Sequence, residues 1–215
     1  MVKAVIFDMD GVLIDSEALW RLALMDVFAG AGIPYTETDA IRTQGMRTVD
    51  IVEKVLAEYP AAVRTAEELD EAIGERVSEL VLATGRVMDG IGHVLDFVER
   101  NGLPLGLATS TPRKVALRFI ERIGIGKRLD VICTGDEVRY GKPHPEIYIL
   151  CADRLGVAPE DCLVFEDSVN GVLAAKAARC RCIAVPDPDL FDDRRYGIAD
   201  YKIRSLSDFD GKTAL

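Results

Sequence analysis

The stretch Ala4-Val-Ile-Phe-Asp-Met-Asp-Gly11 decides how the rest of the chain is interpreted. An apolar run ends abruptly in two carboxylates, Asp8 and Asp10, and the glycine that follows permits a sharp turn. The pattern predicts a buried strand with acids at its tip, although an Asp-Gly pair after a strand is commonly only a turn. Thr109 and Asp167 also follow apolar runs. Because ligands bind at the carboxyl ends of parallel strands, the sequence predicts a catalytic edge there.

Composition limits the classes of function. The chain has 215 residues and is 49% hydrophobic, which suits one large domain or a core with a smaller companion. Its net charge of -10, with 36 acids against 26 bases, argues against a nucleic-acid or anionic-membrane surface. An anionic substrate would need a local cation. The five cysteines show no Cys-x-x-Cys pair and no apolar run approaches membrane length, so we expect reduced thiols in a cytoplasmic protein.

The middle of the first half of the chain is predicted to be helical. Thr65 with Glu68 three residues on is typical of a capping box at a helix start. No strand pattern occurs between residues 16 and 86. Helices are predicted over 17–31 and 49–59 and from Thr65 onward, and 33–45 is predicted as loop and turn.

After residue 87 the pattern alternates between strand and helix. Such alternation predicts an α/β fold with a doubly wound, Rossmann-like parallel sheet and helices on both faces. The first strand belongs to this sheet by its composition, so residues 1–15 and 87–215 form the predicted core and 16–86 an inserted α-helical cap domain. The predicted helices are 91–101, 112–123, 145–155 and 169–178, with Thr111 as the cap of the second and Ser168 at the start of the fourth. The predicted strands are 103–108, 130–134, 163–165 and 182–185.

The residues at the predicted sheet edge suit phosphoryl transfer. A carboxylate can attack phosphorus and form an aspartyl-phosphate, and Asp8 is the candidate nucleophile. Asp10 has the offset of a general acid and base, which would protonate the leaving alkoxide and later deprotonate water. Because one anion attacks another, a cation is needed, and carboxylates with oxygen donors suit Mg²⁺. Asp167 and Glu166 would complete that site with Asp8.

Two further residues could hold the phosphoryl group. The Thr109 hydroxyl and nearby backbone N–H groups at a helix start can bind its oxygens. Lys142, in Gly141-Lys-Pro-His-Pro145, can neutralise both the phosphoryl group and Asp8. Taken alone, Lys142 would more often be a solvated lysine and Thr109 a helix cap. Glu166-Asp167-Ser168 alone would be an acidic helix start. The catalytic hypothesis therefore depends on their convergence.

Four ordered motifs resemble those of the haloacid dehalogenase-like hydrolases over essentially the whole chain. This resemblance implies that Asp8 is the nucleophile, Asp10 the acid/base, and Thr109 and Lys142 the phosphate partners. It also implies that Asp8, Asp167 and the backbone oxygen of Asp10 bind Mg²⁺. The motifs are Asp8-Met-Asp-Gly-Val-Leu-Ile-Asp-Ser-Glu17, Leu107-Ala-Thr-Ser-Thr111, Gly141-Lys-Pro-His-Pro145 and Phe165-Glu-Asp-Ser-Val-Asn-Gly171.

The cap resembles that of the β-phosphoglucomutase and sugar-phosphatase branch. Ile-Asp-Ser-Glu-Ala-Leu-Trp20 is similar to bacterial 2-deoxyglucose-6-phosphate and hexitol-phosphate phosphatases. The resemblance implies a Mg²⁺-dependent phosphatase that hydrolyses a small phosphorylated sugar or polyol. The β-phosphoglucomutases have a histidine where Trp20 stands, and an indole can donate one hydrogen bond but cannot exchange a proton. We therefore expect hydrolysis of the phosphate ester rather than the phosphomutase reaction. The expected substrate-binding residues are Thr109, Ser110, Lys142, Arg47, Glu17 and Trp20.

A lone arginine in a helical domain, such as Arg47, most often faces solvent. Arg47 stands beside a glycine at a helix start, where its charge is unfavourable. The sequence therefore predicts that Arg47 reaches across a closed cleft to substrate hydroxyls or phosphate oxygens.

Three other classes share parts of this pattern. Response-regulator receivers also carry an acceptor Asp, an acidic pair, a Ser/Thr and a Lys on a doubly wound sheet, but they lack an insert after the first strand. Haloacid dehalogenases need neither Mg²⁺ nor an acid/base at Asp10. A phosphomutase differs only in what accepts the phosphoryl group. The expected protein is monomeric, with a small phosphorylated metabolite as its partner and neither nucleic acid nor membrane.

Overall fold

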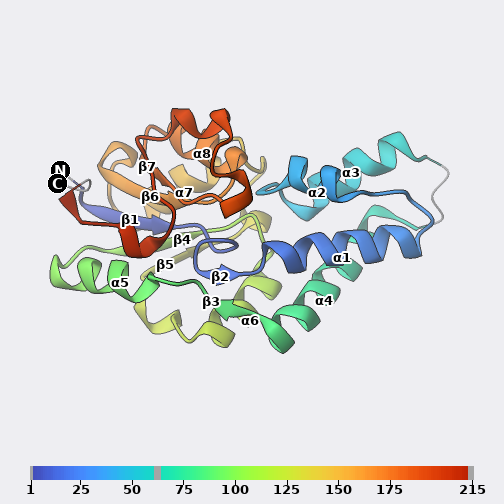
Figure 1. The fold of residues 1–215 in the computed structure, drawn as a ribbon, viewed down its shortest axis with the longest axis horizontal. Coiled ribbons are helices and arrows are strands. Elements are labelled where there is room, and N and C mark those ends of the chain that lie inside the picture. Colours follow the sequence, from blue (N-terminus) through green and yellow to red (C-terminus); the bar gives the residue numbers. More distant parts are fainter. Residues whose placement is uncertain (1, 61–63, 213–215) are drawn as a thin grey trace.

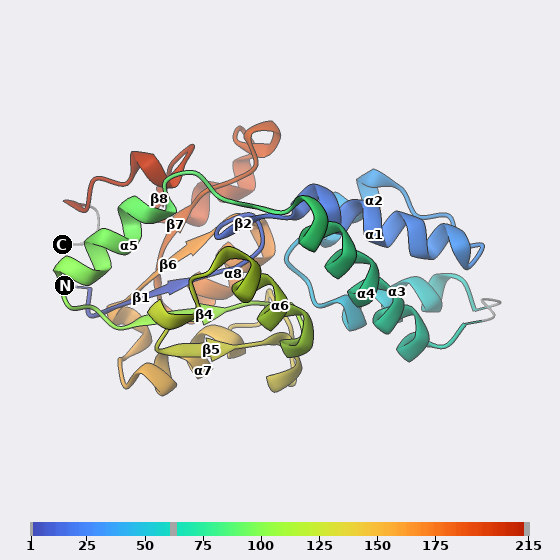
Figure 2. The same cartoon turned by 90° about the horizontal axis from the view of Figure 1, so that it is seen from below.

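A six-stranded parallel sheet forms the centre of the protein. The computed structural model describes residues 2–60 and 64–212. The strand order is β5-β4-β1-β6-β7-β8, so β1 lies between the strands that precede Thr109 and Asp167 (Figure 2). The strands are β1 (Ala4–Phe7), β4 (Leu105–Ala108), β5 (Val131–Cys133), β6 (Cys162–Glu166), β7 (Arg181–Ala184) and β8 (Tyr201–Lys202).

Helices cover both faces of this sheet. In Figure 1, α5 (Ile91–Arg100) and α6 (Arg113–Ile123) lie below it, and α7 (Glu146–Leu155) and α8 (Val169–Ala177) lie above it. Side chains alternate along β1: Val5 and Phe7 pack with α5 and α6, whereas Ala4 and Ile6 pack with α7 and α8. The doubly wound α/β fold predicted from the alternating pattern is confirmed. Short 3-10 turns lie at Gly126–Arg128, Gly135–Glu137, Pro159–Asp161, Pro188–Leu190, Arg194–Ile198 and Leu206–Asp208.

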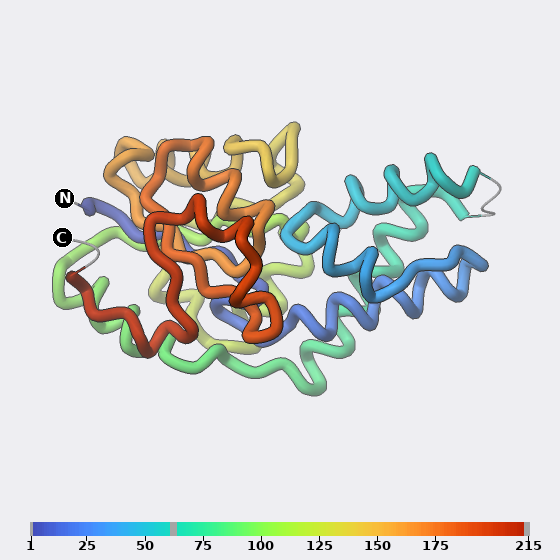
Figure 3. The backbone as a smooth tube through the Cα atoms, turned by 45° about the horizontal axis from the view of Figure 1, so that its top comes forward, coloured from blue at the N-terminus to red at the C-terminus, as the bar shows by residue number. Residues whose placement is uncertain are grey.

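A helical cap extends from the core at the side of the strand tips (Figures 1 and 3). It has its own apolar cluster, in which Phe28, Val52 and Ile73 are fully buried. The two linkers to the cap pair as a short antiparallel ribbon, β2 (Ile14–Asp15) with β3 (Arg86–Val87). Its helices are α1 (Glu17–Gly30), α2 (Glu37–Thr43), α3 (Thr48–Glu58) and α4 (Ala66–Thr84).

The cap also packs against the core through α4 and α6. The Glu75 carboxylate on α4 accepts hydrogen bonds from Lys114 at 2.7 Å and from Arg118 at 2.9 Å on α6. These side chains are partly exposed, so water and salt screen the ion pairs and they add little to stability. The ion pairs therefore orient the cap more than they stabilise it.

Several local predictions from the sequence are wrong. Residues 33–45 were expected to be loop, but Thr36 and Asp39 form a capping box that begins α2. Residues 16–86 were expected to contain no strand, but β3 begins at Arg86. The sheet was expected to have five strands, and β8 adds a sixth. The strands β2, β3 and β8 have only two residues each, which is too short for alternation to show. The capping box at Thr65 and the Ser168 cap of α8 are confirmed. The boundaries at 15/16 and 86/87 stay a prediction.

All five cysteines are free and buried, as expected for apolar core positions. Among the described residues, no helix combines the length and the apolar character needed to cross a bilayer.

Gly106 in β4 is constrained by the helix above it. A Cβ there would lie 2.5 Å from the Cys151 sulfur and 3.0 Å from a Leu155 methyl group. We expect Gly106→Ala to lower the free energy of unfolding by about 1–3 kcal/mol through overpacking. Gly92 in α5 meets no atom within 4 Å, so Gly92→Ala should raise stability by roughly 0.5–1 kcal/mol. Urea unfolding of both variants measures this, and equal effects would contradict the packing argument.

Candidate active site

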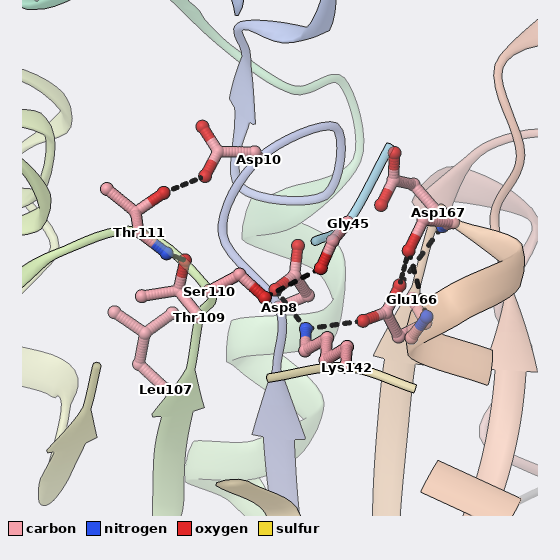
Figure 4. Close-up of polar contacts among 12 residues, drawn as sticks. Asp8, Asp10, Gly45, Leu107, Thr109, Ser110, Thr111, Lys142, Glu166 and Asp167 are labelled. Carbon is pink, nitrogen blue, oxygen red and sulfur yellow. Dashed lines mark hydrogen bonds and ion pairs between the residues drawn. The ribbon is translucent and has the colours of Figure 1, made fainter. Parts of the chain in front are cut away.

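Three neighbouring strands bring the predicted catalytic side chains together. Asp8 and Asp10 follow β1, Thr109 follows β4 and Asp167 follows β6, and all four are less than a tenth exposed. Gly11 has a φ of 72°, and a Cβ on it would overlap the Asp167 carboxylate. The glycine is therefore required both for the turn and for the approach of β6. Figure 4 shows the resulting group of side chains.

Lys142 reaches this group from the loop before α7. Its Nζ donates hydrogen bonds of 2.6 Å to Asp8 Oδ1 and of 2.6 Å to Glu166 Oε1, and the residue is 2% exposed. Burial lowers the pKa of Lys142, but the charges of Asp8 and Glu166 outweigh it and leave the pKa raised. Lys142 is therefore a protonated lysine inside the site and not a solvated one.

Glu166 holds Lys142 in place. Its carboxylate also accepts hydrogen bonds from the Tyr148 hydroxyl at 2.6 Å and from the Ser168 amide at 3.0 Å and hydroxyl at 3.1 Å. Gly171 lies so close that a Cβ there would overlap the carboxylate. Both Glu166 oxygens are thus engaged, because three side chains and one amide donate to them. This arrangement favours a role in orienting Lys142 over the predicted role as a metal ligand.

Asp10 is held by three donors that come from different parts of the chain. Its Oδ1 accepts hydrogen bonds from Ser16 at 2.6 Å and from the Trp20 indole at 2.7 Å, and its Oδ2 accepts one from Thr111 at 2.8 Å. Burial raises the pKa of Asp10 and the three donors oppose this rise. Trp20 thus uses the single hydrogen bond that an indole can donate.

Thr111 was not recognised as a site residue from the sequence. It was expected to cap the helix that follows, and Pro112 was expected to be its first residue. In the structure Pro112 occupies the cap position and Thr111 donates its hydroxyl to Asp10. Thr111 stands two residues after Thr109, so the second threonine of the Thr-Ser-Thr run was the only signal in the sequence.

The cap closes over the site and leaves a small pocket. Its cavity is about 50 Å³ and is lined from the core by Asp8, Asp10, Thr109 and Ser110 and from the cap by residues that include Glu17 and Trp20. Removal from water, together with the charges of Asp10 and Asp8, raises the pKa of Glu17 to about 8. A cavity of this size is below the usual range of small-molecule sites, so we expect the cap to open when a ligand enters.

Arg47 lies outside this pocket, contrary to the expected substrate contact. Its guanidinium pairs with Asp50 at 2.6 Å and donates hydrogen bonds to Val138 O at 2.9 Å and to Gly135 O at 3.3 Å in the core. The N–H groups of the Arg47 guanidinium are already bonded to these acceptors, so in this arrangement Arg47 points to the core and not into the pocket.

The acidic group has the composition of a divalent-cation site. Carboxylate oxygens of Asp8, Glu166 and Asp167 lie within 4.8 Å of one another, and all three residues are buried. Burial raises the pKa of Asp8 to about 8 against the opposing charge of Lys142, and it also raises the pKa of Asp167. One lysine cannot neutralise this many buried acids. Because Glu166 is saturated, Asp8 and Asp167 are the residues best suited to hold Mg²⁺.

Comparisons with known proteins identify the family of this chain. The family model for haloacid dehalogenase-like hydrolases matches residues 2–179. The chain is 36% identical over 215 residues to hexitol phosphatase B of Escherichia coli K12, covering 100% of this chain and 97% of that protein. It is 40% identical over 177 residues to a phosphorylated carbohydrates phosphatase of Thermotoga maritima, covering 82% of each.

A solved structure supports the fold. The crystal structure of β-phosphoglucomutase from Clostridium difficile superposes with a TM-score of 0.84 at 23% identity and covers 96% of this chain and 92% of its own. The fold and the site together define a hydrolase of phosphoric monoesters. The chain belongs to the haloacid dehalogenase-like hydrolase family.

Mg²⁺ and protons should compete for the buried acids. The folded-state pKa of Asp8, about 8, lies above the unfolded value of about 3.9. The folded state therefore binds the proton more tightly, and stability falls as pH rises from about 4 to about 8. We expect Mg²⁺ to raise the melting temperature more near pH 8 than near pH 5. Thermal unfolding with Mg²⁺ and with a chelator measures this. Asp167→Asn should abolish most of the increment, and an equal increment at both pH values would contradict the assignment.

Proposed function

We propose that this protein is a Mg²⁺-dependent phosphatase that hydrolyses a small phosphorylated sugar or polyol through an aspartyl-phosphate on Asp8. The observation that carries the proposal is the short contact between Lys142 Nζ and Asp8 Oδ1 at 2.6 Å beside an Asp10 carboxylate held by three donors. The two phosphatases described above are named for hexitols and for phosphorylated carbohydrates, and their names support this substrate class.

Asp8 and Asp10 divide the reaction into two displacements. An Asp8 oxygen attacks phosphorus, and Asp10 donates a proton to the departing alkoxide. Asp10 then removes a proton from water, which attacks the acyl-phosphate and releases inorganic phosphate and the Asp8 carboxylate. The three donors to Asp10 fix the direction in which its carboxyl group points through both steps.

Lys142 and Thr109 stabilise the charge that the reaction moves. The protonated Lys142 neutralises Asp8 before the attack and the phosphoryl oxygens during it. The Thr109 hydroxyl lies at the pocket wall, where it can donate to a phosphoryl oxygen. When bound by Asp8, Asp167 and the backbone oxygen of Asp10, Mg²⁺ supplies further neutralisation of the phosphoryl group.

The competing functions receive less support. A receiver domain conflicts with family membership and with the helices inserted after β1. A dehalogenase would have no need for the hydrogen-bonded acid at Asp10. A phosphomutase remains the nearest alternative because one structural neighbour is a β-phosphoglucomutase. We further propose a monomeric, cytoplasmic enzyme whose partner is the small phosphorylated substrate, without nucleic acid or membrane.

Substitution of the two aspartates tests the chemistry. Asp8→Asn keeps the shape of the side chain but cannot form the acyl-phosphate, so we expect turnover to be lost. Asp10→Asn should lower kcat by roughly a hundred- to ten-thousand-fold. Phosphate release from a panel of hexitol and sugar phosphates measures both, with circular dichroism as the control for folding. Retained activity in Asp8→Asn would remove the nucleophile assignment.

Trp20 bears on the choice between phosphatase and mutase. Its indole donates to Asp10 and cannot exchange a proton, so nothing at this position relays protons between substrate and acid/base. We expect water to take the phosphoryl group from Asp8. Nuclear magnetic resonance of β-glucose 1-phosphate turnover should show phosphate release without glucose 6-phosphate accumulation. Faster isomerisation than hydrolysis would favour the mutase.

A further inference from the structure

The turn between α2 and α3 touches the catalytic edge of the core, on the other side of the site from Trp20 of α1. Its position at the end of the cap nearest the core is visible in Figures 1 and 3. The Gln44 amide donates to Asp167 Oδ2 at 2.6 Å, and Asn170 donates to the Gln44 carbonyl at 2.8 Å. The Ser110 hydroxyl donates to the Gly45 carbonyl at 2.6 Å, as Figure 4 shows. Each contact joins the cap to a residue next to, or in, the reacting group.

Arg47 makes the largest set of these contacts. Its guanidinium donates to the carbonyl oxygens of Val138 at 2.9 Å, Gly135 at 3.3 Å and Arg139 at 3.3 Å. Asp50 holds the same guanidinium through two oxygens, at 2.6 and 2.8 Å. The side chains of Arg47 and Asp50 are 15% and 25% exposed. Charged, planar and partly shielded donors of this kind form strong, directional hydrogen bonds.

The core segment 135–141 is shaped to receive this ion pair. A Cβ on Gly141 would overlap Asp50 Oδ2 and lie 2.8 Å from Arg47 Nε. A Cβ on Gly135 would first overlap the Ser110 carbonyl oxygen of the core and would also lie 3.1 Å from Arg47 Cγ. The pair therefore packs against both ends of the segment. The residue that follows the segment is Lys142, whose Nζ contacts Asp8.

We propose that Arg47 and Asp50 are a positioning pair that couples cap closure to the placement of Lys142. When the cap closes, the Arg47 guanidinium donates hydrogen bonds to the carbonyl oxygens of residues 135–139, and Asp50 packs against Gly141. These contacts fix the segment that precedes Lys142 and so align Lys142 with Asp8. Catalytic charge stabilisation is then complete only over an enclosed substrate. The coupling rests on the proposed phosphatase function, whereas the closure contact itself does not.

The only tryptophan of the chain provides a readout of closure that needs no substrate. Trp20 lines the pocket under the closed cap and donates to Asp10. We expect Arg47→Met to raise the rate of acrylamide quenching of Trp20 several-fold and to shift its emission to longer wavelength. Arg42→Met removes an exposed cap arginine and should match the wild type. If Arg47→Met also leaves quenching unchanged, the pair does not hold the cap.

Kinetics of the same variants test the coupling to Lys142. With a hexitol phosphate as substrate, Arg47→Met should lower kcat by roughly 10- to 100-fold, as expected for a misplaced catalytic group, with a smaller change in KM. Arg47→Lys should restore part of the loss. Gly141→Ala should reproduce the loss without adding to it in the double variant, because both changes break one contact. Circular dichroism checks folding, and Asp50→Asn replaces Arg47→Met if that variant is unfolded.

The outcomes separate the two proposals. Increased quenching with an unchanged kcat would overturn the coupling and leave Arg47 as a cap contact only. Additive losses in the double variant would also overturn it. If the wild type hydrolyses no phosphate ester, the phosphatase proposal and the coupling fail together, and the quenching experiment still decides whether Arg47 holds the cap.

Discussion

The buried contact of Lys142 with Asp8 and Glu166 is the interaction on which the rest of the site depends. All three groups are almost completely removed from water, and desolvation costs several kcal/mol for each ion. Such a group is stable only if its remaining donors and acceptors are satisfied. Tyr148 from α7 and Ser168 at the start of α8 complete the partners of Glu166. The packing of both helices on the sheet is thereby tied to the position of one ammonium group.

The acid/base residue is tied to the cap in a comparable way. Ser16 and Trp20, which donate to Asp10, lie at the cap end of the β2 linker, whereas Thr111 donates from the core. A movement of α1 therefore changes the surroundings of Asp10. Because the closed pocket is small, we expect the same movement to admit the substrate and to orient Asp10, the proposed acid/base. This link gives a physical reason for the helical insert to follow β1 and no other strand.

Much of the architecture could be predicted because it follows from short-range patterns. Buried apolar runs that alternate with amphipathic segments predict a parallel sheet, and a parallel sheet requires its strand tips to share an edge. Asp8, Thr109 and Asp167 were therefore expected to meet. The two-residue strands β2, β3 and β8 gave no such signal, because a strand this short is defined by its partner and not by its own composition. Helix α2 was missed because its capping box at Thr36 uses aspartate in place of glutamate or glutamine.

The sequence by itself determined which polar residues meet at one edge of the sheet, because the strands and turns that present them are encoded locally. Only the tertiary structure decided how each side chain is used. Glu166 accepts a hydrogen bond from Lys142, Thr111 donates one to Asp10, and Arg47 of the cap donates one to the Val138 carbonyl of the core. Thr111 lies 101 positions from Asp10, and Arg47 lies 91 positions from Val138. Thr111 meets Asp10 because β4 pairs with β1, and Arg47 meets Val138 because the cap packs on the core. No local pattern specifies either contact.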